Sequence, residues 1–309
     1  MKRKKIVVIT LGVLLVVAIV VLPILRPIGR PVADKIAVIP LSGTITFQEA
    51  SFLSGSTITP GLVKEFLTRA EGDAAVKAIV LRIESPGGAV PPCQEILKEI
   101  QRVKEKMPVV VVMENVTASG GYYISTGADK IVALPYALTG SIGVISQAVN
   151  IEGLYEKLGI KIQTFKGGKY KDMHSGLREL TTEEEEIMQR LVDEYYEHFI
   201  EVVAEGRGLT REEVRNLATG QLYSGTEAMR LGLVDELGGL DTAIDLAAEL
   251  AGLEAAVVEY YRPPRITLWS LLGFGNAIRM RLWGFSAQDI ILLETLSQSY
   301  PQPKFLYQG

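Results

Sequence analysis

A chain of 309 residues, 48% of them apolar, is long enough to bury a full core in one large domain or two small ones. Its net charge of −4 argues against a nucleic-acid partner. The single cysteine, Cys93, excludes an internal disulfide, and with only His174 and His198 available a metal site rich in thiolates or imidazoles is not expected. We therefore predict no metal and no cofactor.

The chain begins with a basic stub and an apolar run, which we predict to be an anchor over residues 1–26. The stretch 6–25 carries no charge and is long enough to cross the roughly 30 Å hydrocarbon core of a membrane as a helix. No small-x-small cleavage site follows it, which favours an anchor over a signal peptide. Lys2 to Lys5 precede the run, so the positive-inside rule places the N-terminus in the cytoplasm and the rest outside. We expect a single-pass protein of the cell membrane with an extracytoplasmic catalytic domain.

Residues 27–34 form a short linker, and strands then alternate with helices over residues 35–253. We expect strands at 35–40, 41–45, 76–83, 108–113, 129–134, 161–165 and 221–223, and helices at 61–71, 94–106, 151–159, 181–205, 211–218, 225–231 and 241–253. This alternation predicts an α/β domain with largely buried strands. Ligand sites in such folds lie beyond the carboxyl ends of the strands.

Ser119 is the candidate nucleophile. It follows a short apolar strand and precedes two glycines and a run that can be helical, from Glu114 to Thr126. A serine at a strand-to-helix turn is held out from the scaffold, and a helix start supplies N–H groups that stabilise negative charge. The alternative is that Ser119 only caps the helix.

Two glycine turns lie at this edge of the predicted sheet, at 85–88 and at 119–121, and the second of them contains Ser119. Gly87 and Gly88 follow one strand, and Gly120 follows Ser119, so their backbone N–H groups could form an oxyanion hole. The alternative is that the first of these is simply a tight Pro-Gly-Gly turn. A second serine turn contains Ser141.

The proton acceptor near these turns is predicted to be a lysine. His198 lies in a helical pattern and is interpreted as a helix-face residue rather than a base. Lys166, Lys169 and Lys171 follow the strand expected at 161–165. Lysines beside glycines are ordinarily solvated, but a lysine can act as a base where burial disfavours its ammonium form.

Residues 254–309 form a C-terminal extension of different character. The sequence suggests an edge strand at 257–261 and a stretch at 266–285 with the pattern of an amphipathic helix, which would lie on a membrane or a neighbouring subunit, or form a local flap. The last residues, 301–309, read as an extended tail that could enter an active site.

Five motifs together resemble the signal peptide peptidase A family of membrane-anchored serine proteases. They are Ser85-Pro-Gly-Gly88, Ala118-Ser-Gly-Gly-Tyr-Tyr-Ile-Ser125, Thr139-Gly-Ser-Ile-Gly143, Gly168-Lys-Tyr-Lys-Asp172 and Tyr223-Ser-Gly-Thr-Glu-Ala228. The resemblance covers about residues 35–250 and implies a fold similar to Clp protease and crotonases. It implies a Ser/Lys dyad, a homo-oligomeric ring and no cofactor. Its site residues here would be the nucleophile Ser119, the base Lys171, Ser141 holding the lysine amine, and the oxyanion donors Gly88 and Gly120.

Three departures accompany this resemblance, one of which is that the segment after about residue 255 lies outside the matched region. Position 84 is Glu where the family more often has Asn or Asp, and Asp172 directly follows the base, where a carboxylate would favour a charged lysine. On a strand, Asp172 would point to the opposite face from Lys171.

The predicted function is cleavage of signal-peptide remnants and other apolar peptides at the outer membrane face. The alternatives are a related protease with a stomatin-like membrane-protein substrate, an acyl-CoA enzyme on the crotonase scaffold, and a catalytically inactive membrane scaffold.

Overall fold

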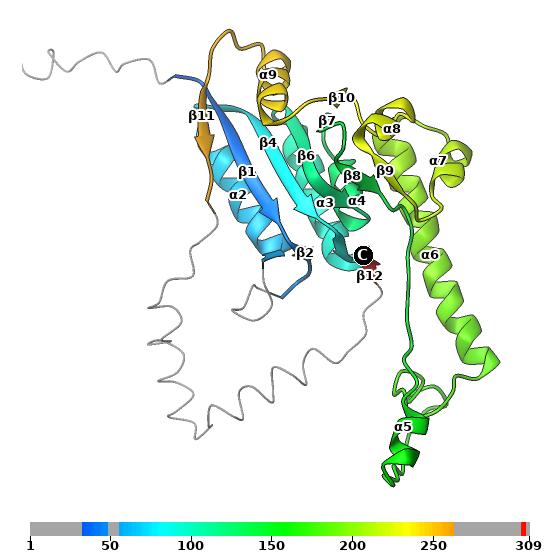
Figure 1. Cartoon of the computed structure of the whole chain (residues 1–309). Helices are drawn as coiled ribbons and strands as arrows, with labels where there is room; N and C mark the ends of the chain where they lie inside the picture. The colour runs from blue at the N-terminus through cyan, green and yellow to red at the C-terminus, as the bar shows by residue number, and fades with distance from the viewer. Residues whose placement is uncertain (1–32, 49–55, 263–303, 307–309) are drawn as a thin grey trace, which may run out of the picture.

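The computed structural model describes residues 33–48, 56–262 and 304–306, and its centre is an eight-stranded sheet (Figure 1). The strands run in the order β10-β7-β6-β4-β1-β11, with β8 paired to β6 and β9 paired to β8. All of these pairs are parallel except β8 with β9. The strands are β1 (Lys35–Ser42), β4 (Val76–Ser85), β6 (Val109–Ala118), β7 (Lys130–Ala133), β8 (Leu138–Gly140), β9 (Leu222–Ser224), β10 (Glu236–Leu237) and β11 (Val257–Tyr260). The predicted α/β class is confirmed.

Helices cover both faces of the sheet. The helices α2 (Pro60–Gly72), α3 (Val90–Lys104) and α4 (Gly120–Ser125) lie on one face, and α9 (Leu240–Leu250) lies on the other (Figure 1). Successive side chains of a strand point to opposite faces, so Ile79 and Leu81 of β4 join one buried cluster, while Ala78 and Val80 join the other. Because both faces are buried, the central strands read as continuous apolar runs.

The helix α6 (Thr182–Arg207) extends from the body of the molecule (Figure 1). It begins with a capping box between Thr181 and Glu184, ends at Gly208 with φ 65°, and its 26 residues span about 39 Å. Its C-terminal half is buried in the core through Phe199. Its N-terminal end meets residues 145–181, which we call the arm and which contain α5 (Glu152–Lys157). The helices α7 (Arg211–Leu217) and α8 (Gly225–Arg230) follow α6.

A second, small sheet lies beside the carboxyl end of β4. Its order is β12-β5-β2-β3, formed by β12 (Lys304–Leu306), β5 (Gly87–Ala89), β2 (Thr44–Ile45) and β3 (Thr57–Ile58). The first predicted glycine turn is therefore itself a strand, and the C-terminal segment of the chain pairs with it.

Besides the strand at 87–89, the structure contains the short strands β3, β8 and β10, which were not expected, and it differs from the expected elements at three further points. Residues 161–165 form no strand: Ile162 is 49% exposed, Phe165 is 87% exposed, and no described strand lies alongside to supply hydrogen bonds. The strand expected at 108–113 continues to Ala118, directly before Ser119. The first strand does not stop at Pro40 but runs on to Ser42. The edge position predicted for β11 is confirmed.

Several expectations lie outside the described residues: the anchor at 6–25, part of the loop at 51–60, the amphipathic stretch at 266–285, and most of the tail. Within the ranges that are described, no helix has the length and apolarity to cross a bilayer.

Candidate active site

Two serines have an unusual backbone conformation. Ser119 lies between β6 and α4 with φ 53° and ψ −119°, and Ser141 follows β8 with φ 49°. They are the two residues other than glycine that have positive φ in the described part of the chain. Holding such a conformation costs about 1–3 kcal/mol, and positions that keep it cluster at functional sites. These are the same two serines that the sequence motifs single out.

The sheet brings these serines side by side. Ala118 of β6 is paired in register with Gly140 of β8. Ser119 directly follows Ala118, and Ser141 directly follows Gly140. The Ser119 backbone N–H donates to the Gly140 carbonyl at 2.7 Å, and the Ser141 N–H donates to the Gln221 carbonyl at 2.8 Å. Both turns therefore leave neighbouring parallel strands at the same level, at the edge where α/β folds bind ligands.

Buried threonine hydroxyls tie the ends of these strands together. Thr117 donates from Oγ1 to the Ile83 carbonyl at 2.6 Å, and Thr139 donates from Oγ1 to the Thr117 carbonyl at 2.7 Å. These two bonds join β4 to β6 and β6 to β8 at the strand ends, just before the two serine turns. The base of the site is therefore fixed by side chains as well as by strand pairing.

The Ser119 hydroxyl is buried and unpaired. The residue is 1% exposed, and its Oγ has no hydrogen-bond partner among the described residues. Leaving a buried hydroxyl unsatisfied costs about 1–3 kcal/mol. Ser125, six residues later on the same helix, instead donates to the Gly121 carbonyl at 2.7 Å. The Ser119 hydroxyl therefore makes no cap hydrogen bond to the helix and remains available as a candidate reactive group.

The predicted oxyanion glycines meet at this turn. A Cβ on Gly120 would lie 3.1 Å from the Gly88 nitrogen and 2.7 Å from the Cys93 sulfur, and a Cβ on Gly88 would lie 1.9 Å from the Ile45 carbonyl oxygen. Gly87 has φ 111°, and its N–H donates to Ser85 Oγ at 3.1 Å. The structure therefore brings Gly88 and Gly120 together, while the Gly87 amide is engaged within its own turn.

The departure at position 84 has a structural explanation. The pairing of β4 with β6 shifts register between Ile83 and Ser85. There the Glu84 carboxylate accepts hydrogen bonds from the backbone N–H groups of Asn115 and Val116 at 3.2 and 3.1 Å, and from the Asn115 side chain at 3.0 Å. Glu84 thus replaces strand hydrogen bonds at an irregularity below the serine turn.

Neither Cys93 nor His198 competes with Ser119 as a reactive group. Cys93 is fully buried behind Gly120, and this burial raises the pKa of its thiol well above the usual range. His198 lies on α6 with Nε2 3.1 Å from the Tyr123 hydroxyl. This agrees with its interpretation as a helix-face residue. In the described ranges no group of three or more His, Cys, Asp or Glu residues is placed to hold a metal.

The three candidate lysines lie on the arm, and their partners differ. Lys166 pairs with Asp172 at 2.6 Å, and Lys169 pairs with Glu183. Lys171 is exposed, and its side chain makes no ion pair or hydrogen bond to any residue the structure describes. The expectation that Asp172 lies on a strand, facing away from Lys171, is wrong because residues 169–174 form turns. The Asp172 carboxylate is instead occupied by Lys166 and Arg178.

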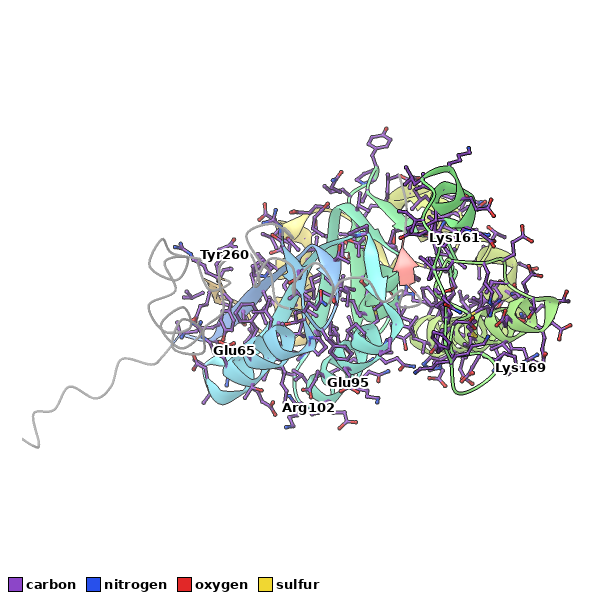
Figure 2. All side chains as sticks on the ribbon, turned by 90° about the horizontal axis from the view of Figure 1, so that it is seen from below. Glu65, Glu95, Arg102, Lys161, Lys169 and Tyr260 are labelled. Atoms are coloured by element: carbon purple, nitrogen blue, oxygen red, sulfur yellow. The ribbon has the colours of Figure 1, made fainter. Side chains whose placement is uncertain are left out.

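Within one chain the arm lies far from Ser119. Tyr123 of α4 contacts Phe199 of α6, with ring centroids 5.3 Å apart, whereas the arm is bonded to Glu184 in the first turn of the same helix. Glu184 and Phe199 are 15 positions apart on α6, which is about 22 Å along the helix axis. Figure 2 shows Lys161 and Lys169 on the arm, on the opposite side of the molecule from Tyr260. A single chain therefore does not join Lys171 to Ser119.

The edge of the site is occupied by the chain's own C-terminal segment. β12 pairs antiparallel with β5, with Phe305 opposite Gly88 and Leu306 opposite Gly87. The edge of β5 therefore accepts an extended chain beside the amide predicted to bind an oxyanion. A separate open pocket of about 490 Å³ is lined by residues of the arm alone and contains none of the serine-turn residues.

Comparisons with known proteins show which family this chain resembles in sequence. Residues 101–254 match the profile described as Peptidase family S49. A protein of Enterococcus faecium named for signal peptide peptidase A is 38% identical over 247 residues, covering 79% of this chain and 72% of that protein. A protein of Methanocaldococcus jannaschii named as a protease is 37% identical over 252 residues, covering 78% of this chain and 80% of that protein. A solved structure of a membrane-bound stomatin-specific protease aligns with a TM-score of 0.49 at 16% identity, covering 75% of this chain and 99% of that one.

Proposed function

Because the chain belongs to peptidase family S49 and is a serine protease, we propose that Ser119 is its nucleophile and Lys171 its general base. The observation that carries this proposal is the buried, unpaired Ser119 hydroxyl on a strained strand-to-helix turn, beside the amides of Gly88 and Gly120. We further propose that the scaffold is of the Clp protease and crotonase type.

The dyad would be completed between two copies of the chain. Lys171 is unpaired and exposed on an arm that lies away from its own serine turn. The arm also exposes large apolar side chains: Val149, Leu154, Leu158, Ile160, Ile162 and Phe165. Large exposed apolar side chains gathered on one segment point to an interaction site. A second copy packed against the arm would cover this surface and enclose the amine, as in a homo-oligomeric ring.

The chemistry then uses side chains and backbone groups of this sequence, supplied by two copies, with water for the second step. Neutral Lys171 takes the proton of the Ser119 hydroxyl, and Oγ attacks the scissile carbonyl carbon. The oxyanion is held by N–H groups near Gly88 and Gly120, the amine leaves with the proton from Lys171, and water then releases the acyl group. Ser141, which leaves the neighbouring strand at the same level as Ser119, would orient the lysine amine.

We propose that the substrates are signal-peptide remnants and other apolar peptides. A relative is named for signal peptide peptidase activity, and the edge of β5 accepts an extended chain. An anchor at residues 6–25 would hold the site at the outer face of the membrane. Kinetics on released signal peptides and on intact membrane proteins would separate this assignment from a protease dedicated to one membrane protein.

Treatment with an acylating serine-protease probe is expected to add the probe mass to Ser119, as located by peptide mass spectrometry. The labelling rate should rise towards alkaline pH, because the proposed base must be neutral to remove the proton. Ser125→Ala is the matched control, since this substitution removes a buried but hydrogen-bonded hydroxyl of α4. The Ser125→Ala protein should still be labelled at Ser119. Labelling at another residue would refute the assignment of Ser119.

Removal of residues 301–309 is expected to lower KM for short peptides severalfold, because β12 and a substrate would compete for the edge of β5. Steady-state kinetics of the full chain and the truncated chain, at equal assembly mass, would measure this effect. An unchanged KM would show that the pairing does not limit access.

A further inference from the structure

We propose that Arg178 is the positioning residue for Lys171, acting as a clamp between Asp172 and Glu184. The clamp fixes the turn that carries Lys171 to the first turn of α6. This inference rests on the proposed role of Lys171 as the base. Arg178 itself lies in the arm and touches neither the serine turn nor β5.

The geometry of the clamp is doubly bidentate. Arg178 donates to Asp172 from Nε at 3.1 Å and from Nη2 at 2.8 Å. It donates to Glu184 from Nη1 at 2.8 Å and from Nη2 at 2.6 Å. Paired, charge-assisted bonds of this kind fix orientation as well as distance, and only the planar guanidinium fork can make them. Asp172 directly follows Lys171, so one end of the clamp lies beside the base in the chain.

The other end of the clamp is anchored in the helix start. The Glu184 side chain is 2% exposed, and it also accepts from the Thr181 N–H at 2.9 Å and from the Thr181 hydroxyl at 3.1 Å. Hydrogen bonds from Arg178 lower the pKa of Glu184 to about 2 and hold that of Asp172 well below its usual range. Both carboxylates therefore remain charged throughout the range in which a lysine base would work.

A second link between the turn and α6 is exposed. Lys169 and the Tyr170 hydroxyl contact Glu183, whose side chain is 51% exposed. Exposed pairs contribute little because solvent screens them and the side chains lose entropy. The neighbouring positions 183 and 184 thus offer one exposed and one buried carboxylate in the same helical turn.

Fixed placement matters here because the arm has little regular structure around Lys171. Residues 169–178 form turns and bends, with local bonds such as the Lys171 N–H to the Gly168 carbonyl at 3.4 Å. Proton transfer requires the base within hydrogen-bond reach of the hydroxyl, and a displacement of about 1 Å can cost 10²-fold in rate. Losing the clamp should therefore lower kcat and leave substrate binding at β5 unchanged.

The test is steady-state peptide cleavage by the full-length protein and its Arg178→Gln and Arg178→Lys variants, with assembly mass measured by native mass spectrometry. Arg215→Gln is the matched control, because Arg215 makes a bidentate pair to Glu197 on α6 that does not involve the arm. We expect R178Q to lower kcat roughly 10- to 100-fold with KM unchanged. R178K should recover part of this loss, and R215Q should behave like the wild type.

Three further variants distinguish the possible failures. Glu184→Gln should lower kcat while Glu183→Gln should not, and R178Q should add nothing in a Lys171→Ala background if Arg178 acts through that lysine. If Lys171→Ala is inactive but R178Q matches R215Q, the clamp proposal is overturned and the base assignment stands. If R178Q lowers activity only by dissociating the assembly, and R178K and E184Q do the same, the role is structural and the proposal is also overturned. A fully active Lys171→Ala protein would instead remove the proposed function.

Discussion

The Lys171→Ala protein is expected to lose peptide cleavage by about 10²–10⁴-fold while its thermal unfolding temperature stays within a few degrees of the wild type. The activity should fall because no amine remains to remove the Ser119 proton. The stability should hold because the Lys171 side chain is exposed and bonded to no described residue. Lys169→Ala is the matched control on the same turn, since Lys169 pairs only with the exposed Glu183 side chain and the Tyr170 ring.

Mixing the two inactive proteins tests whether the site is shared between copies. In co-assembled Lys171→Ala and Ser119→Ala chains, a site can combine the serine of one copy with the lysine of the next. Random mixing in a closed ring would restore about a quarter of the wild-type sites. Each protein assembled alone should remain inactive. If the mixture also stays inactive while forming mixed assemblies, the two groups act within one chain, and the arm must fold back onto its own body.

Gly120→Ala is expected to lower kcat by about 10²-fold with a smaller effect on KM, since one oxyanion donor is worth this much. The added methyl group would press on the Cys93 sulfur at 2.7 Å and on the Gly88 nitrogen at 3.1 Å. Either displacement moves the predicted oxyanion donors apart. Steady-state kinetics together with thermal unfolding would separate the loss of rate from the loss of stability.

A double variant makes this prediction sharper. Cys93→Ala removes the sulfur contact but leaves the Gly88 contact, so Gly120→Ala with Cys93→Ala should regain stability without regaining kcat. Gly72→Ala is the matched control, because a Cβ at Gly72 meets no atom within 4 Å. Recovery of full activity in the double variant would show that Gly120 matters only for packing.

The body of the fold was predictable because its strands are locally unambiguous. Val109 to Met113 are five consecutive buried apolar residues, and such runs bounded by turn residues indicate a strand covered on both faces. The serine turn was predictable for a related reason: a serine and two glycines directly after a buried strand indicate a tight strand-to-helix turn. The positive φ of Ser119 and Ser141 could not be read from propensity, but the motifs pointed to the same two residues.

The arm was less predictable because several of its large apolar side chains are exposed in the described part of the chain. Residues 161–165 contain Ile162, Thr164 and Phe165, which favour strands, yet Ile162 and Phe165 are exposed and no described strand pairs with this segment. The segment was predicted to be a strand of the α/β domain, whereas we now propose that it is buried against a second copy. The Arg178 clamp was missed because Asp172 and Glu184 are six residues to either side of it, a spacing that no regular element favours.

The single cysteine lies directly beneath the serine turn, with Gly120 closing over its sulfur. A thiol reagent such as a maleimide can reach it only when that turn lifts away from α3 or when the whole body unfolds. The modification rate of Cys93 in the native protein therefore reports how often the serine turn opens locally. Comparing that rate with and without a bound acyl group would report how firmly the turn is held during turnover.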